Sequence, residues 1–525
     1  MVITGYDEGF ENYMDMMNET GFGFAQVWPL LTSGFLVMAV TVELMGISII
    51  APASQCDLKT NQTKITALNC SAFIGVVVSL YFWAVLADSY GRRWILLLST
   101  SVNSCISLIS ALMPTFPLFI AMRFCVGIFI AGPSFAAITY LAEFCTFYHR
   151  RIVIIYMAMF QGFAMIYCPV MATLFIHQKW TYDLGLIVYK PWRFLMLLNS
   201  LPGLIGIFLL IGLPESPEIL LCTQRKQECI QVVKWIYRVN KRKELEWEVE
   251  PEDLSCPGYR IVDEQTCMEL MNQSRPLFKK PYVVPFLSSC VVMSSLFFLG
   301  NGLGIWFTDL RNRRIHEDLE LYTICENMRR FHEFYSKVDG CQVTLQSFRD
   351  SMFLGATYLI MFNVVALLLR YISPKIIVVA LQILCFLLGG VLPWITDETT
   401  TSAIFIIFLA IPNCLIALVS GIVIEFTTAD LRGKAVCLCI LIGRSGMIAG
   451  TFLVGYAMDV NCELTYNLFG LYALACSVVS VLLPGKWKCF RLIADQPELR
   501  SRSMSVIRTR SMLRPTEMYE TMLRK

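Results

Sequence analysis

The sequence predicts an all-α membrane protein in which twelve transmembrane helices form two pseudo-symmetric six-helix bundles. Composition is the first reason, since 56% of the 525 residues are hydrophobic, only 16% are charged and the mean hydropathy is +0.59. These values lie far from those of a water-soluble globular protein. The second reason is that apolar runs of membrane-spanning length recur along the chain.

The first six spans follow from apolar runs of roughly 18 residues or more. They are expected at 27–52, 66–87, 94–113, 117–139, 152–176 and 191–213. The first run has no basic region before it and is too long for the core of a signal peptide, so we expect it to be retained as a span. Six more spans are expected after a polar stretch, at 282–305, 351–370, 374–395, 403–426, 435–457 and 465–484.

This pattern predicts five regions. They are an N-terminal tail (1–26), a first six-helix bundle (27–221), a linker (222–280), a second bundle (281–484) with an outer loop at 308–350, and a C-terminal tail (485–525). Two six-helix halves joined by a hydrophilic linker are typical of transporters whose halves rock about a site near the middle of the membrane.

Basic residues in short loops predict the orientation, because they are retained on the cytoplasmic side. Arg92 and Arg93 mark one such loop and Arg150 and Arg151 another, and the C-terminal tail holds ten Lys or Arg against four acidic residues. The linker and both termini are therefore expected in the cytoplasm. The loop 308–350 is expected on the outer side, yet it has arginines directly beside the end of a span, which disagrees with this rule. The even number of spans is the stronger evidence, so we keep the predicted orientation.

Two covalent modifications, a glycan and a disulfide, are expected in the outer loops. Asn61 begins an Asn-Gln-Thr sequon in the first outer loop, so we expect a glycan there. Cys325 and Cys341 share the large outer loop and are candidates for a disulfide, whereas most other cysteines fall inside spans and are expected to pack in the core. The four histidines are scattered singly, so no metal site is expected.

Few ionisable residues lie inside the expected spans, where each costs about 2.5–3.5 kcal/mol on insertion scales. Arg123 and Arg444 are interpreted as structural charges that hold one helix against another. Glu43 is better placed for work on a substrate or a proton. Gln161 and Asn363 are the amides expected inside the bundles.

Charged residues at the cytoplasmic ends of the spans predict a gate. Asp88 precedes a glycine turn and can accept hydrogen bonds at the positive end of a neighbouring helix. Each half also has a glutamate followed by an arginine at equivalent places, and such ion pairs would close the inner side in one of two states. The alternative interpretation is that these residues are ordinary charged groups of a cytoplasmic surface and form no gate. The residues expected to form the gate are Asp88, Gly91, Arg92, Arg93, Glu143, Arg151, Glu425 and Arg432.

Several ordered motifs resemble those of the major facilitator superfamily, in its branch of synaptic vesicle glycoproteins and organic-ion transporters, a sugar-porter-like branch. The motifs are Leu86–Arg93, Arg123-Phe124 with Gly127 and Gly132, Tyr140–Phe144, Pro214–Pro217, Gly302–Phe307 with Asp309, and Glu425–Arg432 through Gly433 to Arg444. The resemblance implies the superfamily fold over nearly the whole chain. Where the vesicle glycoproteins carry an acid three residues before the glutamate of the first span, this chain has Val40, so Glu43 stands alone.

The leading functional hypothesis is a carrier of a small organic solute, either an organic ion or an amphipathic metabolite, that works by alternating access with or without a coupling proton or ion. Its aromatic residues suit an organic cation or an amphipathic molecule. The expected pathway residues are Glu43, Trp83, Gln161, Trp306 and Asn363.

The alternative hypothesis is a receptor or trafficking scaffold with the same fold that transports nothing. An enzyme is not expected, because no nucleophile, base and metal occur together, and no cofactor is expected. A net charge of +3 without a basic domain excludes nucleic acid as a partner. We expect a monomer in the lipid bilayer of the plasma membrane or of an intracellular vesicle.

Overall fold

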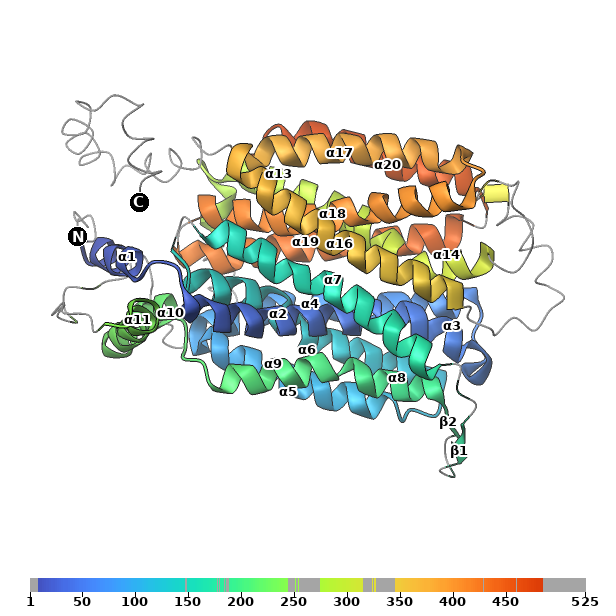
Figure 1. The fold of residues 1–525 in the computed structure, drawn as a ribbon, viewed down its shortest axis with the longest axis horizontal. Coiled ribbons are helices and arrows are strands. Elements are labelled where there is room, and N and C mark those ends of the chain that lie inside the picture. Colours follow the sequence, from blue (N-terminus) through green and yellow to red (C-terminus); the bar gives the residue numbers. More distant parts are fainter. Residues whose placement is uncertain are drawn as a thin grey trace.

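The computed structural model confirms the fold class, with twelve helices in its described part that are long and apolar enough to cross a membrane (Figure 1). The structure describes residues 8–484 except 147–148, 177, 179, 184, 186–187, 244–250, 252–253, 255–273, 315–322, 324, 327–344, 428 and 459. The helices run roughly parallel to the long axis of the molecule, so hydrophobic side chains on their outer faces can contact lipid.

The first bundle contains six spans, and its first and sixth spans are each built from two helices in succession. At the first break, Gly46 follows α2 and begins the turn into α3. The helices are α2 (Phe24–Met45) with α3 (Ile47–Leu58), α4 (Gln62–Tyr90), α5 (Arg92–Ser110), α6 (Phe116–Glu143), α7 (Arg150–Phe175), and α8 (Pro191–Asn199) with α9 (Leu201–Ile211). A short antiparallel hairpin of β1 (Tyr182–Asp183) and β2 (Val188–Tyr189) precedes α8.

The second bundle repeats this plan. Its first span changes from α-helix to a π-helical segment, η3, before the chain continues into α14. The elements are α13 (Val283–Phe297), η3 (Phe298–Gly302), α14 (Phe307–Arg314), α16 (Leu345–Tyr371), α17 (Pro374–Val391), η4 (Leu392–Trp394), α18 (Glu398–Phe426), α19 (Ala429–Ala457) and α20 (Cys462–Ser480).

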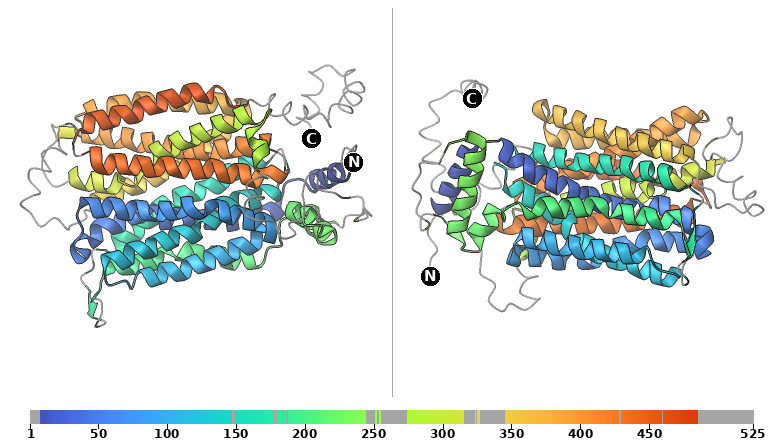
Figure 2. Two further views of the ribbon diagram at one scale, coloured as in Figure 1. Left: turned by 180° about the vertical axis from the view of Figure 1, so that it is seen from behind. Right: turned by 60° about the horizontal axis from the view of Figure 1, so that its bottom comes forward.

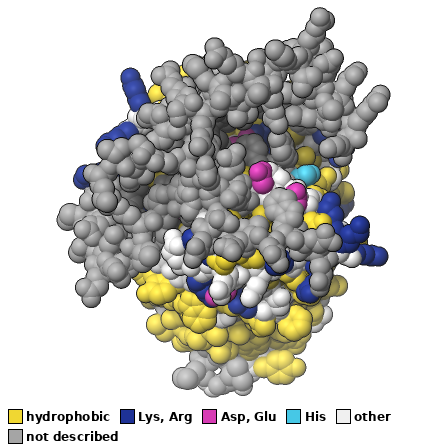
Figure 3. All heavy atoms as spheres, turned by 90° about the vertical axis from the view of Figure 1, so that its left-hand side faces the viewer, with side chains coloured by type: hydrophobic (Ala, Val, Ile, Leu, Met, Phe, Trp, Pro, Cys, Tyr) yellow, Lys and Arg dark blue, Asp and Glu magenta, His cyan; other side chains and the backbone are white. Residues whose placement is uncertain are grey.

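The two ends of the molecule differ, and we name them by what they carry. The linker end carries α1 (Glu8–Thr20), α10 (Pro217–Cys222), α11 (Lys226–Lys241) and η2 (Arg275–Phe278), and the hairpin end carries β1, β2, α3 and α14 (Figures 1 and 2). Seen from the linker end, Lys and Arg side chains lie at the margins of this face and hydrophobic side chains cover the flank of the bundle (Figure 3).

The two bundles meet along helices that pair across the molecule. α7 packs on α16 along one side, and α4 packs on α19 along the other. The contacts between the halves are thus made by packed helices on both sides of the molecule.

The structure corrects the expected disulfide. Cys325 is bonded to Cys462, with 5.3 Å between their Cα atoms, and Cys341 lies outside the described residues. Cys462 is the first residue of α20. Spacing along the chain could not reveal this pair, because the two cysteines are 137 residues apart and come together only when the outer loop folds onto the start of the last span.

Cys462→Ser is expected to lower the free energy of unfolding by about 2–5 kcal/mol, since a disulfide that closes a long loop restricts the unfolded chain. Thermal unfolding in detergent micelles would measure the loss. Cys105→Ser, which removes an exposed free cysteine, is the matched control. Equal melting temperatures for the two variants would contradict the pairing, as would a non-reducing peptide map without the Cys325–Cys462 link.

Candidate functional site

A cavity lies between the two bundles and is lined by residues of both halves. The first bundle contributes α2, α6 and α7 to its wall, and the second contributes α13, η3, α16, α18 and α19. Its wall contains both polar and apolar side chains. The polar ones are Thr41, Ser134, Gln161, Asn301, Tyr358, Asn413, Ser420 and Arg444.

The wall formed by the second bundle is irregular where it meets the cavity. Asn301 belongs to the π-helical segment η3, and such segments occur often at functional sites because they disturb the regular backbone ladder. Beside this segment, the Asn413 amide donates a hydrogen bond of 2.7 Å to the Tyr358 hydroxyl. The cavity therefore offers several fixed donors and acceptors in an otherwise apolar interior.

Arg444 carries the only charge among the described residues that line the cavity. Its side chain is 8% exposed, its guanidinium carbon lies 4.9 Å from the centre of the Phe297 ring and 5.9 Å from that of Phe73, and Nη1 approaches the Met447 sulfur at 3.7 Å. No carboxylate of the described chain pairs with it. Arg444 therefore contacts aromatic rings of two other helices and also lines the cavity.

Arg123, by contrast, has a carboxylate partner inside the first bundle. Its Nη1 lies 3.0 Å from Glu43 Oε2, and its Nη2 donates to the Ser110 hydroxyl at 2.6 Å. Both charged side chains are nearly completely buried, at 3% and 2% exposure. Glu43 therefore neutralises Arg123 between α2 and α6 and is not among the residues that line the cavity.

Glu43→Gln is expected to destabilise the protein by about 3–5 kcal/mol, because it leaves the Arg123 guanidinium buried without its counter-charge. Thermal unfolding in micelles would measure it. The double variant Glu43→Leu with Arg123→Met removes both charges and is expected to regain most of the loss. Full stability of Glu43→Gln alone would show that the pair contributes nothing to the fold.

Of the five residues expected to line the pathway, the structure places only Gln161 at the described cavity. Trp83 and Trp306 are buried in the packing between helices, where their indole N–H groups donate to the backbone oxygens of Ile128 (2.7 Å) and Thr451 (3.2 Å). Asn363 lies on an exposed face of α16 and donates to an oxygen of its own helix. Helix rotation, which residue spacing does not fix, separates these side chains.

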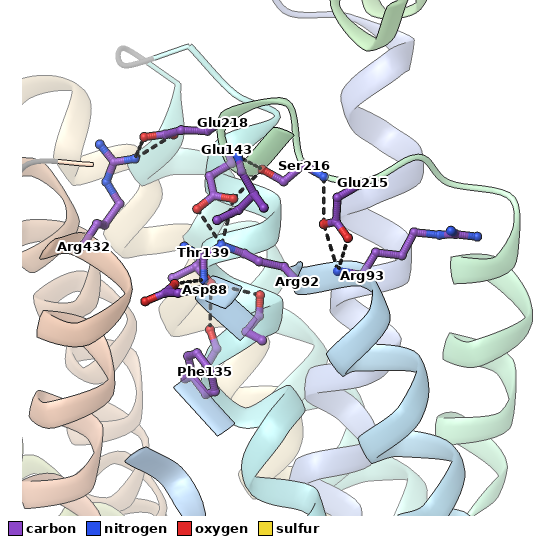
Figure 4. Close-up of polar contacts among 12 residues, drawn as sticks. Asp88, Arg92, Arg93, Phe135, Thr139, Glu143, Glu215, Ser216, Glu218 and Arg432 are labelled. Atoms are coloured by element: carbon purple, nitrogen blue, oxygen red, sulfur yellow. Dashed lines mark hydrogen bonds and ion pairs between the residues drawn. The ribbon is translucent and has the colours of Figure 1, made fainter. Parts of the chain in front are cut away.

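A buried ion-pair network lies at the linker end of the first bundle (Figure 4). Arg92 Nε lies 2.7 Å from Glu143 Oε1, and Ser216 donates to the same carboxylate at 2.5 Å. Asp88 Oδ1 lies 3.3 Å from Arg92 Nη1. The start of α5 is thereby fixed to the end of α6 and to the segment before α10.

The neighbouring turn depends on glycine. Gly91 has φ +99°, a conformation that other residues rarely adopt, and a Cβ there would come within 2.5 Å of Glu215 Oε2. Glu215 in turn accepts a hydrogen bond of 3.0 Å from the backbone N–H of Arg93, whose side chain points away in Figure 4. The Arg93 guanidinium donates instead to the backbone oxygen of Ile211 at 2.9 Å, so Arg93 joins this turn to the end of α9.

Three more ion pairs lie at the linker end, at or beside the interface between the two bundles. Glu218 Oε1 lies 2.6 Å from Arg432 Nη1 of α19, and Glu218 Oε2 lies 3.3 Å from Arg150 Nη2 of α7. Arg151 of α7 pairs with Glu425 of α18. Arg432 and Glu425 belong to the second bundle, so two of the three pairs tie the halves together.

Asp88 also lies at this interface. A Cβ built on Gly433, the fifth residue of α19, would be 2.9 Å from Asp88 Oδ1. The carboxylate therefore lies close to the backbone of α19 near the start of this helix. Glycine at position 433 permits this approach.

Glu218 was not among the expected gate residues, although it has two arginine partners. It lies in the six-residue helix α10 and is 3% exposed. Burial alone would raise its pKa, but Arg432 and Arg150 outweigh burial and hold the pKa below its ordinary value. A depressed pKa means that the charged form of Glu218 stabilises the folded protein above the ordinary pKa, and that this contribution is lost only as the pH falls through the lower value. Glu218 therefore stays charged at physiological pH.

The halves also touch at the hairpin end, where α3 of the first bundle contacts α14 of the second. There Arg311 of α14 is buried and lies 2.5 Å from Asp350 of α16, which accounts for one of the arginines that disagreed with the predicted orientation. Contacts at both ends leave the cavity in the middle of the molecule.

Comparisons with known proteins agree with this architecture. A family model described as the Major Facilitator Superfamily matches residues 31–324. Synaptic vesicle glycoprotein 2A of Rattus norvegicus is 27% identical over 238 residues, which are 45% of this chain and 32% of that protein. Synaptic vesicle glycoprotein 2C of Mus musculus is 25% identical over 339 residues, which are 60% of this chain and 47% of that protein. The matches thus span a third to a half of these relatives.

Solved structures share the fold at low sequence identity. The xylose transporter XylE from E. coli, in a partially occluded inward open conformation, has a TM-score of 0.60 at 13% identity and covers 87% of this chain and 98% of its own. The human organic anion transporter MFSD10 (TETRAN) has a TM-score of 0.58 at 12% identity and covers 86% of this chain and 99% of its own. With a family model that covers more than half of its residues and two bundles around a central cavity, the chain belongs to the major facilitator superfamily.

Proposed function

We propose that the protein is an alternating-access transporter of a small organic anion. The observation that carries this proposal is the unpaired guanidinium of Arg444 in the cavity between the halves. A buried charge without a partner is costly, and in membrane proteins such residues belong to substrate or ion pathways. A carboxylate or another organic anion would supply the missing counter-charge.

The rest of the cavity supports an anion over a cation. The described lining residues include no Asp or Glu, whereas Gln161, Asn301 and Tyr358 provide amide and hydroxyl groups that can donate hydrogen bonds. The aromatic residues that favoured an organic cation in the sequence are occupied elsewhere, since Trp83 and Trp306 pack between helices. MFSD10, which shares the fold, is described as an organic anion transporter, and this agrees with the proposal.

The ion pairs at the linker end suit the gate of such a cycle. Glu218 with Arg432, and Arg151 with Glu425, hold the two bundles together where an inner opening would form. Opening at the linker end would break these ion pairs and strengthen the packing of α3 on α14 at the hairpin end. Each state would then be stabilised by contacts at one end, and the two states would have comparable free energies. In this proposal the linker end, with its basic residues, faces the cytoplasm.

Uptake into proteoliposomes tests the proposal. The purified protein would be reconstituted and offered a panel of radiolabelled aliphatic and aromatic carboxylates, sulfonates, organic cations and sugars, with empty liposomes as the control. We expect saturable uptake of at least one anion, and faster uptake when the same unlabelled anion is present inside. Saturable transport confined to cations or sugars would refute an anion site, and absence of transport or binding across the panel would favour a scaffold.

A further inference from the structure

Gly304 lines the cavity between the bundles at a place where packing does not require a glycine. It lies in the helical turn that follows η3, and a Cβ built on it would have no heavy atom of the described neighbouring segments within 4 Å. Glycine destabilises a helix relative to alanine, because it loses more conformational entropy on folding. A larger residue would therefore suit the helix itself better, and it would cause no clash with the described neighbours.

The two preceding glycines of the same segment are explained by packing. A Cβ at Gly300 would be 2.7 Å from the side-chain nitrogen of Asn413 in α18, and a Cβ at Gly302 would be 3.0 Å from the Cα atom of Gly450 in α19. Both distances are too short for an ordinary contact, so these positions need glycine. Gly304 differs, because a side chain there would extend into open space at the wall of the cavity.

Gly304 lies about two helical turns from the charge of Arg444. The ring centre of Phe297 is 4.9 Å from the Arg444 guanidinium carbon, and Phe297 precedes Gly304 by seven residues on the stretch formed by α13, η3 and the next turn. Seven helical residues rise about 10 Å. Arg444 is the only charged residue among the described residues that line the cavity. The cavity is therefore charged at one level and uncharged about 10 Å further along.

Contacts around the cavity place Gly162 of α7 at the same depth as Gly300 of η3. A Cβ at Gly162 would be 2.8 Å from the Leu359 side chain of α16. Tyr358, the preceding residue of α16, accepts the hydrogen bond of 2.7 Å from Asn413. Asn413 is also the residue that a Cβ at Gly300 would meet. These contacts form a continuous ring from the first bundle to the second.

Met165 and Gly304 both line the cavity about one turn nearer the hairpin end than this ring. α7 and α13 run toward the hairpin end, since β1 and β2 follow α7 and α14 follows η3 (Figure 1). Methionine is unbranched and flexible, so it adapts to apolar groups of different shape. This level of the cavity therefore combines open space beside Gly304 with an adaptable apolar side chain.

We propose that the transported anion is amphipathic, that it binds with its anionic group at Arg444 and its apolar end toward the hairpin end, and that Gly304 limits the size of this apolar end. This inference rests on the proposed function, because it assigns an orientation and a shape to the same substrate. A larger residue at position 304 would exclude bulky apolar groups and leave the charged end of the site intact.

Equilibrium binding of two radiolabelled carboxylates to the full-length chain in lipid nanodiscs tests this inference, with empty nanodiscs as the background. Butanoate and 4-phenylbutanoate carry the same charge and differ by a phenyl ring at the far end of the four-carbon chain. The native chain is expected to bind 4-phenylbutanoate roughly 10- to 100-fold more tightly, the size expected for burial of an aromatic ring. Gly304→Leu is expected to weaken binding of 4-phenylbutanoate by roughly tenfold or more, because the added side chain takes the space of the ring.

The affinity for butanoate should change much less in Gly304→Leu, so the ratio of the two affinities is the decisive readout. Gly390→Leu of α17 is the matched control, since a Cβ at Gly390 also has no heavy atom within 4 Å and Gly390 is not among the described residues that line the cavity. It should bind both carboxylates as the native chain does. If Gly304→Leu does not fold, Gly304→Ala decides, and its affinity ratio should fall by roughly threefold.

Affinity ratios within twofold of the native ratio in the Gly304 variants would overturn the role of Gly304. Equal binding of the two carboxylates by the native chain, or binding of neither, would overturn the amphipathic substrate and its orientation. In those cases uptake of another organic anion into proteoliposomes would leave the proposed function standing. If the expected ratios are found but no anion is transported, the proposed function fails and the place of the apolar end beside Gly304 stands.

Discussion

Arg444→Met is expected to abolish saturable uptake of organic anions while leaving the protein folded. Methionine fills much of the same volume against Phe297 and Phe73, so the packing of α19 is largely kept. The variant loses the only charge among the described residues that line the cavity. Loss of one partner of a buried charge pair costs about 2–5 kcal/mol, so the affinity for an anion should fall by roughly 30-fold or more.

Direct binding of the best labelled anion, measured at equilibrium in micelles, separates affinity from the rate of transport. Arg444→Lys keeps the positive charge and should retain part of the affinity, although lysine cannot make a two-pronged contact with a carboxylate. Arg225→Met makes the same chemical change at an exposed arginine of the linker end and should bind normally. Undiminished anion binding by Arg444→Met would remove the central argument for an anion carrier.

Glu218→Gln is expected to shift the protein strongly toward a state that is open at the linker end. The change leaves Arg432 and Arg150 buried beside a neutral amide, so the closed arrangement loses a pairing worth about 2–5 kcal/mol. If the two states are otherwise comparable in energy, the open population should rise by roughly 30-fold or more.

Fluorescence energy transfer across the interface would measure this shift. Bio-orthogonal labels at positions 90 and 371 report the distance between the bundles, because Tyr90 and Tyr371 are exposed and are the last residues of α4 and α16, in different halves. Glu228→Gln, which alters an exposed glutamate of α11, is the control and should leave the distance distribution unchanged. A closed distribution in Glu218→Gln would show that this carboxylate does not hold the gate.

The spans and the fold class were predictable because hydropathy is a local property that each segment carries by itself. The first span expected at 27–52 lies within the observed helical stretch Phe24–Gln55, and the last, expected at 465–484, overlaps Cys462–Ser480. The charges at the helix ends were also predictable as a group, since positive charge gathers at one side of a membrane.

The pairing of those charges was not predictable, because it depends on the packing of distant segments. Glu218 meets Arg432 from 214 residues away and Arg150 from 68 residues away, and its position in a short helix after the sixth span gave no signal of its own. Most of the residues predicted for the pathway do not line the cavity, and the reason is different. Asn363 and Trp306 are polar or aromatic in apolar spans, but only the rotation of each helix decides whether such a side chain faces a cavity, a neighbour or lipid.

Only one of the two arginines inside the membrane has its charge neutralised by a carboxylate, and this difference has an electrical consequence. Glu43 cancels the charge of Arg123, whereas nothing among the described residues cancels that of Arg444. A carrier loaded with a monovalent anion would then be neutral at its centre, and the empty carrier would bear one positive charge. Membrane voltage acts on a moving charge with about 2.3 kcal/mol per 100 mV, so it would bias the return of the empty carrier and leave the loaded step almost untouched.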